Sequence, residues 1–404
     1  MAVGLQEPES LLAIDGVRLA SVAAGIKKNQ TEDLVLIEMQ DRCECAAVFT
    51  QNKFCAAPVT LAKKHLDKAK PRYLLINSGN ANAGTGEQGM LDALQSCVLV
   101  SQQFSCKPEE VLPFSTGVIG ENLPVEKIAS SMKKLEQNLS ANNWIAAGHG
   151  IMTTDTKLKG VSKQIELQGK TVTVTGLSKG AGMIQPNMAT MLAYIATDAA
   201  ISQPLLEDCL KDAVNLSFNS ITVDSDTSTN DACVLIASGC AGNELISKKD
   251  SDYQELLQLI RDVFINLAQA IIRDAEGATK FVSLQVNSAQ TVADARQVAY
   301  TIAHSPLVKT ALFASDPNWG RILAAVGRSG VDFELDKIQI YLGDVCIVSN
   351  GGRDPAYTEE QGQQVMNQQE IVIRVELNTG NESACIWTSD LSYDYVKINS
   401  EYRS

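Results

Sequence analysis

The sequence predicts an α/β fold with a smaller C-terminal α+β unit. Short apolar runs of strand length, such as residues 34–39, alternate with segments of helical spacing, of which residues 252–275 are the longest. After about residue 287 the chain carries a helix-like segment among short strand-like runs with turn residues between them. A chain of 404 residues has room for two or three domains. We therefore expect a core over residues 1–286 and a second domain over residues 287–404.

Composition argues against several classes of protein. The formal net charge of −13 argues against a nucleic-acid-binding protein and against a polybasic membrane protein. No apolar run approaches the roughly 18 residues that a membrane-spanning helix needs, and residues 1–7 contain no basic region. We therefore expect a cytoplasmic protein with no nucleic-acid partner and no membrane partner.

The ten cysteines follow neither a metal-binding nor a disulfide pattern. Cys43 and Cys45 lie close together, but no second pair or histidine completes a zinc site. The chain is too long for a small disulfide-rich scaffold, so reduced thiols are expected. We predict no metal site and no bound cofactor.

Three early strands are expected, at residues 34–39, 45–50 and 72–77. The loop after the third contains Gly84-Thr85-Gly86-Glu87-Gln88-Gly89, a literal match to the dinucleotide-binding fingerprint. In that fingerprint the first glycine lies at the strand end, whereas Gly84 comes well after Asn77. We interpret these asparagines and glycines as turn residues. A dinucleotide- or amino-acid-binding protein without catalysis is the alternative that rests on this loop.

The next segments predict a helix and then a Thr-Gly motif. The helix is expected over residues 89–104, with apolar positions at Leu91, Leu94, Val98 and Val100. The segment from 113 to 120 that follows is compatible with a strand-to-loop turn. It is equally compatible with an oxyanion site, because the hydroxyl of Thr116 and the backbone N–H of Gly117 can point at one oxygen atom.

The centre of the chain, residues 179–194, contains a candidate nucleophile, Thr190. A strand at 171–175 precedes it, after a hairpin turn at 168–170. Gly180 and Gly182 favour tight turns. The run from 188 to 196 that follows has the length of a strand and is apolar, broken only by Thr190. A threonine in a strand usually only packs. It becomes a nucleophile if the preceding bond is cut, because its own α-amine can then act as the base.

The segments after the centre predict two helices and a polar run. One helix follows Ser202, and the long helix covers about 252–275. The acidic run 224–231 lacks the glycine and terminal glutamate of a calcium loop, so we interpret it as a polar wall or a capping turn. Glu276 lies near the C-terminus of the long helix, where the helix dipole disfavours an acid, which suggests a function for it.

The C-terminal part predicts a helix near 291–303 and two hairpins, turning at 343–344 and at 378–380. Of the three histidines, His65 lies in a lysine-rich helix that we expect to be solvated. None of them stands in a Ser-His-Asp or Cys-His motif. Nucleophilic catalysis without histidine is consistent with an N-terminal threonine.

The run Lys-Gly-Ala-Gly-Met-Ile-Gln-Pro-Asn-Met-Ala-Thr-Met-Leu, residues 179–192, resembles the self-processing motif of the ornithine acetyltransferase family. The resemblance implies an αββα sandwich of the N-terminal-nucleophile type. It also implies cleavage between Ala189 and Thr190 into chains 1–189 and 190–404, which assemble as a heterotetramer. Matching motifs run from the Asn/Gly-rich loop to the last residue.

The resemblance also implies roles for individual residues. Thr190 carries the acetyl group, and Thr116 with Gly117 forms the oxyanion hole. The family usually ends in threonine, whereas this chain ends in Ser404, which retains a hydroxyl. The substrate-binding residues implied in this way are Thr153, Lys179, Thr190, Glu276, Asn399 and Ser404.

The activity implied is a ping-pong acetyl transfer from N2-acetylornithine to glutamate in arginine biosynthesis. Some family members also accept acetyl-CoA, which leaves acetyl-CoA open as a second donor for this chain. A self-cleaving aminopeptidase or amidase of related fold is the second enzyme hypothesis. It would hydrolyse its acyl-enzyme with water, so product formation would not require glutamate.

Overall fold

The computed structural model describes residues 2–185 and 191–401 of the chain. Three of the predicted site residues, Ala189, Thr190 and Ser404, lie outside the described residues. Every other predicted site residue is described, so the arrangement of the site can be compared with the expectation.

Within the described residues, the N-terminal two thirds of the chain form two sheets. The strand order of the first sheet is β1-β2-β4-β5, and only β4 and β5 run parallel. Its strands are β1 (Val17–Val22), β2 (Leu34–Met39), β4 (Tyr73–Asn80) and β5 (Val111–Val118). The strand order of the second sheet is β3-β10-β8-β7-β6. Its strands are β3 (Glu44–Phe49), β6 (Lys159–Leu167), β7 (Lys170–Lys179), β8 (Leu192–Thr197) and β10 (Ala232–Ala237).

The two sheets pack face to face over a shared core. Ile37 and Phe114 of the first sheet lie in one buried cluster with Tyr194 and Val234 of the second. The rings of Phe114 and Tyr194 meet edge to face, with centroids 5.3 Å apart. The strands β2, β8 and β10 are buried at nearly every position, because one face of each packs on the other sheet and the opposite face is covered by helices.

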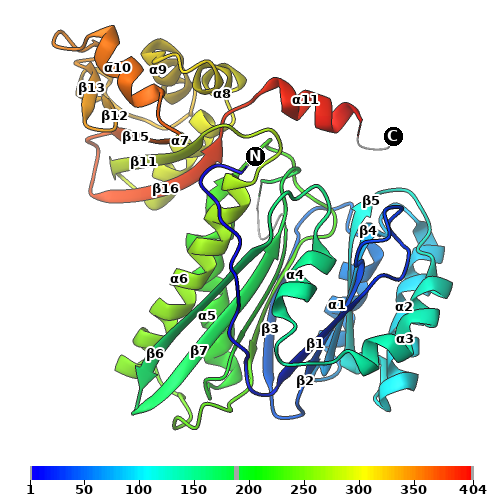
Figure 1. The fold of residues 1–404 in the computed structure, drawn as a ribbon. Coiled ribbons are helices and arrows are strands. Elements are labelled where there is room, and N and C mark those ends of the chain that lie inside the picture. Colours follow the sequence, from blue (N-terminus) through cyan, green and yellow to red (C-terminus); the bar gives the residue numbers. More distant parts are fainter. Residues whose placement is uncertain (1, 186–190, 402–404) are drawn as a thin grey trace.

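Helices cover the outer face of each sheet. The first sheet is covered by α2 (Gly86–Phe104) and α3 (Val125–Gln137), and the second by α5 (Gln203–Leu216) and α6 (Ser251–Arg273). The shorter helices α1 (Ala57–Leu66) and α4 (Trp144–Ile151) contribute to the core between the sheets. The layers are therefore αββα, as Figure 1 shows, and the predicted fold class is confirmed.

Of the predicted apolar positions of α2, Val100 is buried, but Leu91 and Leu94 are not. Leu91 is 59% exposed and Leu94 is 41% exposed, whereas the buried side carries the smaller Ala93 and Cys97. The helix packs closely between its sheet and α3, so small residues face inward. His65, expected on a solvated helix, is also buried, and its Nδ1 lies 2.8 Å from the carbonyl oxygen of Val111.

The Gly84 loop is shorter than the sequence predicted. The strand before it, β4, continues to Asn80, and α2 begins at Gly86. Gly89 packs so closely on Thr85 and Asn82 that a side chain there would collide with both. The glycines of this loop therefore serve a tight strand-to-helix connection.

The C-terminal part forms a third sheet, with the order β14-β13-β12-β15-β11-β16-β9. Its strands are β9 (Ile221–Thr222), β11 (Phe281–Ala289), β12 (Gln339–Leu342), β13 (Val345–Ser349), β14 (Gly352–Arg353), β15 (Glu370–Glu376) and β16 (Glu382–Ser389). Its helices are α7 (Val292–Ala303), α8 (Pro306–Phe313), α9 (Trp319–Gly327) and α10 (Glu359–Met366), and α11 (Tyr393–Ser400) follows the last strand.

Two predictions for this part need correction. The segment 378–380 does not turn a hairpin, because β11 lies between β15 and β16 and pairs with both. The expected domain boundary at 286/287 falls inside β11, whose residues from Val282 onward belong to the third core. Phe281, the first residue of β11, still packs in the core beside α6, and the third core begins with Val282. The hairpin at 343–344 is confirmed by the pairing of β12 with β13.

The last helix leaves the third sheet and returns to the core. In Figure 1, α11 extends beside the upper end of the αββα layers. Within the described residues, no helix is both long and apolar enough to cross a membrane. The return of α11 is important because it places the C-terminal residues beside the ends of strands from both sheets.

Candidate functional site

A cavity of about 310 Å³ lies where strands of the two sheets end. Its walls come from the end of β5, the end of β7, the start of β8, the loop before β10 and the segments around residues 153 and 276. The cavity brings together all the predicted site residues that the structure describes, namely Thr116, Gly117, Thr153, Lys179, Glu276 and Asn399. These residues are far apart in the sequence.

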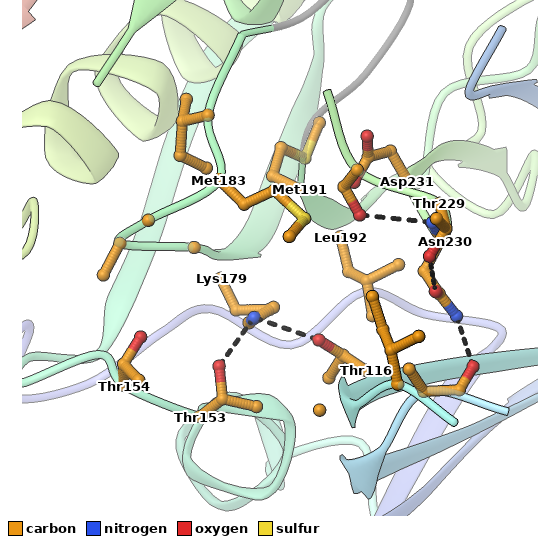
Figure 2. Close-up of a pocket in the computed structure, with 18 of the residues that line it drawn as sticks. Thr116, Thr153, Thr154, Lys179, Met183, Met191, Leu192, Thr229, Asn230 and Asp231 are labelled. Carbon is orange, nitrogen blue, oxygen red and sulfur yellow. Dashed lines mark hydrogen bonds between the residues drawn. The ribbon is translucent and has the colours of Figure 1, made fainter. Parts of the chain in front are cut away.

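Lys179 is the last residue of β7 and is buried. Its ammonium nitrogen donates hydrogen bonds to the hydroxyl oxygens of Thr116, at 3.1 Å, and Thr153, at 2.8 Å, as Figure 2 shows. An ammonium group can only donate, so both hydroxyls act as acceptors. Each threonine therefore keeps its own hydroxyl hydrogen for another acceptor.

Gly117 occupies a position that only glycine fits. Its φ is +132°, and a Cβ there would lie 2.3 Å from the carbonyl carbon of Gly79 and 2.5 Å from the backbone nitrogen of Asn80. The close approach lies where the pairing of β4 with β5 becomes irregular, since Asn80 lies opposite both Thr116 and Val118. Gly117 lines the cavity without a side chain.

A buried ion-pair network lies behind Lys179. The carboxylate of Asp155 accepts hydrogen bonds from the backbone of Thr153, at 2.9 Å, and of Gly180, at 2.7 Å. It also accepts from the ammonium of Lys159 at 2.6 Å, and that ammonium reaches Asp274 at 2.6 Å. The side chains of this Asp-Lys-Asp triad are at most 1% exposed.

Burial and charge shift the pKa values of these groups. Burial lowers the pKa of Lys179, and the carboxylate of Asp155 is the largest opposing effect. Burial alone raises the pKa of Asp155, but the ammonium groups of Lys159 and Lys179 outweigh it and hold that pKa well below its ordinary value. The geometry therefore pairs a buried cation with a carboxylate that stays ionised.

Glu276 forms the opposite wall of the cavity. Its backbone nitrogen donates to the carbonyl of Ala181 at 2.9 Å, which ties the end of α6 to the glycine loop. A Cβ on Gly182 would lie 2.4 Å from a Glu276 carboxylate oxygen, so this glycine makes room for the carboxylate. The side-chain amide of Asn399 donates a hydrogen bond to the same carboxylate, at Glu276 Oε2, over 2.8 Å.

The acidic run 224–231 acts both as a capping turn and as a cavity wall. Asp224 accepts from the backbone nitrogens of Met183, at 2.7 Å, and Ile184, at 2.8 Å. Asp231 lines the cavity and is buried, which raises the pKa of its carboxyl well above the ordinary value. Its Oδ2 has no hydrogen-bond partner among residues 2–185 and 191–401.

Sequence reasoning missed three contributors to this site. Asp155 has no predicted role in the sequence analysis, and Asp231 is expected only as part of the polar run 224–231. Asn230 ties the wall to the first sheet, because its amide donates to the carbonyls of Ala81, at 2.6 Å, and Ser115, at 3.0 Å. A carboxylate next to threonines is the local signal for Asp155. Of its partners in the triad, Lys159 lies four residues further on, whereas Asp274 is remote in the sequence.

Comparisons with known proteins identify relatives over the full chain. A family model described as the ArgJ family matches residues 18–404. The chain is 53% identical over 406 residues to the arginine biosynthesis bifunctional protein ArgJ of Pseudomonas fluorescens, with 100% of both chains covered. The protein of the same name from Pseudomonas syringae pv. tomato is 54% identical over 406 residues, again with 100% of both covered. A solved structure of an ornithine acetyltransferase complexed with ornithine, from Mycobacterium tuberculosis, is 34% identical. That match covers 45% of this chain and 96% of the solved chain, with a TM-score of 0.39.

Proposed function

Because this chain belongs to the ArgJ family, we propose that it transfers an acetyl group from N2-acetylornithine to glutamate through an acetyl-threonine at Thr190. The chain is an acyltransferase of arginine biosynthesis. The observation that supports this mechanism best is the Lys179–Thr116 hydrogen bond in a cavity that Gly117, Glu276 and Asn399 also line.

Thr190 is the proposed nucleophile. Its neighbour in the chain, Met191, lines the cavity. Cleavage after Ala189 would free the α-amine of Thr190, which takes the hydroxyl proton as the oxygen attacks the acetyl carbonyl. The C–N bond of the donor then breaks, the same proton passes to the departing ornithine amine, and an acetyl ester remains on Thr190. The reverse steps with the amine of glutamate release N-acetylglutamate.

The oxyanion that forms during each step needs two donors. The hydroxyl of Thr116 is suited to this task, because it already accepts from Lys179 and so can direct its hydrogen elsewhere. The backbone N–H of Gly117 is the proposed second donor. A positive ammonium directly behind Thr116 also favours the developing negative charge.

The opposite wall suits the amino-acid part of the substrate. The carboxylate of Glu276 offers an acceptor for an ammonium group, and the ammonium of Lys179 offers a donor to a carboxylate. Thr153, Asn399 and Ser404 complete the proposed substrate-binding set. Thr153 and Asn399 both line the cavity, where Thr153 bonds Lys179 and Asn399 bonds Glu276.

Acetyl-CoA is a proposed second donor. The support is the word bifunctional in the names of the full-length relatives.

We also propose that the two cleaved chains form a heterotetramer, which light scattering would test. A cytoplasmic location is proposed from the ten cysteines, all of which are free thiols.

One experiment tests the transfer and separates it from hydrolysis. The purified protein is incubated with N2-acetylornithine alone, quenched in acid, and digested for mass spectrometry. We expect one acetyl group on the peptide that begins at Thr190, and release of N-acetylglutamate only after glutamate is added. Free acetate released without glutamate would favour the aminopeptidase or amidase hypothesis. An uncut chain with no acyl-enzyme would favour the non-catalytic binding protein.

A further inference from the structure

We propose that Asp155 is a positioning residue that keeps Lys179 charged and thereby directs the Thr116 hydroxyl toward the reacting oxygen. The inference rests on the proposed function, and it assigns a role to a residue that does not line the cavity. Asp155 acts through Lys179 and not on the substrate. Its carboxylate is fully buried behind the site.

Asp155 holds Lys179 from two directions. One bond comes from the backbone nitrogen of Gly180, the residue after Lys179, at 2.7 Å. The other comes from the backbone nitrogen of Thr153, at 2.9 Å, whose hydroxyl accepts from the Lys179 ammonium at 2.8 Å. A single carboxylate therefore fixes both the backbone that carries the ammonium and one of its hydrogen-bond acceptors.

Five charged or titratable groups surround the Lys179 ammonium. The carboxyl groups of Asp155, Asp231 and Glu276 favour its charge, and the ammonium of Lys159 opposes it. Lys27, from the segment after β1, is close enough for mutual repulsion. Burial raises the pKa of Asp231 well above its ordinary value, which weakens its contribution as a negative charge. Asp155 stays ionised and is the principal counter-charge.

The charge of Lys179 decides the direction of the Thr116 hydroxyl. A charged ammonium must donate to Thr116 Oγ1, so the hydroxyl hydrogen points to another acceptor. A neutral amine carries a lone pair and can accept that hydrogen instead. Loss of the Lys179 proton would therefore remove the cation and turn an oxyanion donor away from the cavity.

Asp155 and Lys159 are the two partners of one ion pair. Removing the charge of one should then shift the pH dependence of activity in the opposite direction to removing the charge of the other. Without the charge of Asp155, Lys179 should lose its proton at a lower pH. Without the charge of Lys159, the repulsion that opposes Lys179 disappears and its proton should be held to a higher pH. A residue that only supports the fold would lower activity without moving the pH dependence.

The test is the pH profile of kcat/KM for acetyl transfer from N2-acetylornithine to glutamate. The parent protein should lose activity on the alkaline side as Lys179 deprotonates. Asp155→Asn should move this alkaline limb to lower pH by about one unit or more, the scale on which a close opposite charge shifts a pKa. Lys159→Gln should move it to higher pH.

Asp274→Asn is the matched control. Asp274 bonds the same Lys159 ammonium at the same 2.6 Å, but its other bonds go to Thr156 and Lys157, and it is not among the main charges that shift the pKa of Lys179. This variant should leave the alkaline limb in place even if its activity or stability falls. Circular dichroism and the fraction of cut chain show which variants fold.

An alkaline limb that stays in place in both Asp155→Asn and Lys159→Gln would overturn the inference. Equal shifts in Asp155→Asn and Asp274→Asn would also overturn it, because the effect would then belong to the triad as a structural unit. If Asp155→Asn does not fold, the direction of the Lys159→Gln shift decides alone. A parent protein without acetyl transfer would overturn the proposed function instead, so the two failures are distinguishable.

Discussion

The side-chain amide of Asn399 donates a 2.8 Å hydrogen bond to the carboxylate of Glu276. This bond joins the exposed last helix to the buried segment that follows α6, across more than a hundred residues of sequence. Chain ends normally fray and tolerate change. Here the C-terminal helix instead forms part of the cavity wall.

The first prediction follows from this bond. Deleting residues 399–404, or changing Asn399→Ala, should raise KM for N2-acetylornithine and glutamate while self-cleavage stays largely intact. The reason is that Asn399 bonds Glu276, a residue of the proposed substrate-binding set. Ser400→Ala is the control, because the Ser400 hydroxyl donates to the carbonyl of Lys397 within the same helix. Unchanged KM values in the truncated protein would show an ordinary frayed end.

Self-cleavage gives the second prediction. Mass spectrometry of the purified protein should find a fragment that begins at Thr190. Thr190→Ala should block both cleavage and transfer, because it removes the attacking hydroxyl, whereas Thr190→Ser keeps a hydroxyl and should retain part of both. An active protein that consists only of full-length chain would contradict this prediction.

Thr116 gives the third prediction. Thr116→Ala should lower kcat by roughly 10²–10³, the typical effect of removing one oxyanion donor. Thr116→Ser retains the hydroxyl that accepts from Lys179 and should lose much less. A change confined to KM, with kcat near that of the parent, would remove Thr116 from the oxyanion hole.

Gly117 gives the fourth prediction, which concerns stability. Gly117→Ala should destabilise the fold by about 1–3 kcal/mol more than Gly120→Ala, because overpacking adds to the strain. Both glycines have positive φ, but a Cβ on Gly120 meets nothing within 4 Å, whereas one on Gly117 overlaps the backbone of Gly79. Denaturant unfolding of both variants measures the difference, and equal losses would show that the close approach has no energetic cost.

The fifth prediction concerns His304 and acid pH. Burial, assisted by the positive charges of Lys309 and Arg328, lowers the pKa of His304 from 6.5 to about 4. In the unfolded chain His304 therefore binds a proton below about pH 6.5, whereas in the folded protein it binds one only below about pH 4. Stability from this group should be complete above pH 6.5 and decline as the pH falls toward 4.

His304→Gln should flatten this decline in a series of thermal unfolding midpoints. His149→Gln, at an exposed position in α4, serves as the control and should keep the parent's decline. The same slope in the His304 variant and in the parent would assign the acid sensitivity to other groups.

Local pattern was sufficient for many elements. The stripe of α6 from Leu256 to Ile271 is buried as its spacing predicted, and β2 has the predicted bounds. The hairpin between β6 and β7 turns at Gln168 and Gly169, both with positive φ. These features depend on residues that are neighbours in the sequence, so periodicity and turn residues are enough to predict them.

Pattern failed where packing against distant segments decided the outcome. Leu91 and Leu94 have helical spacing, but the space between α2 and its neighbours accepts only the smaller side of that helix. Residues 378–380 connect β15 to β16, but these two strands do not pair with each other, because β11 lies between them. A strand that enters a sheet from far upstream leaves no local signal.

The sequence by itself determined the composition of the candidate site, because one long motif and its companion segments predicted Thr116, Gly117, Thr153, Lys179, Glu276 and Asn399, and the cavity contains them all. Only the tertiary structure decided how these side chains act on one another. The Lys179 ammonium between two threonines, the carboxylate of Asp155 behind it and the Asn399 amide on Glu276 all join segments that the chain separates widely. Hydrogen bonds and charge interactions act over a few ångströms in space and not along the chain, so no local pattern could predict them.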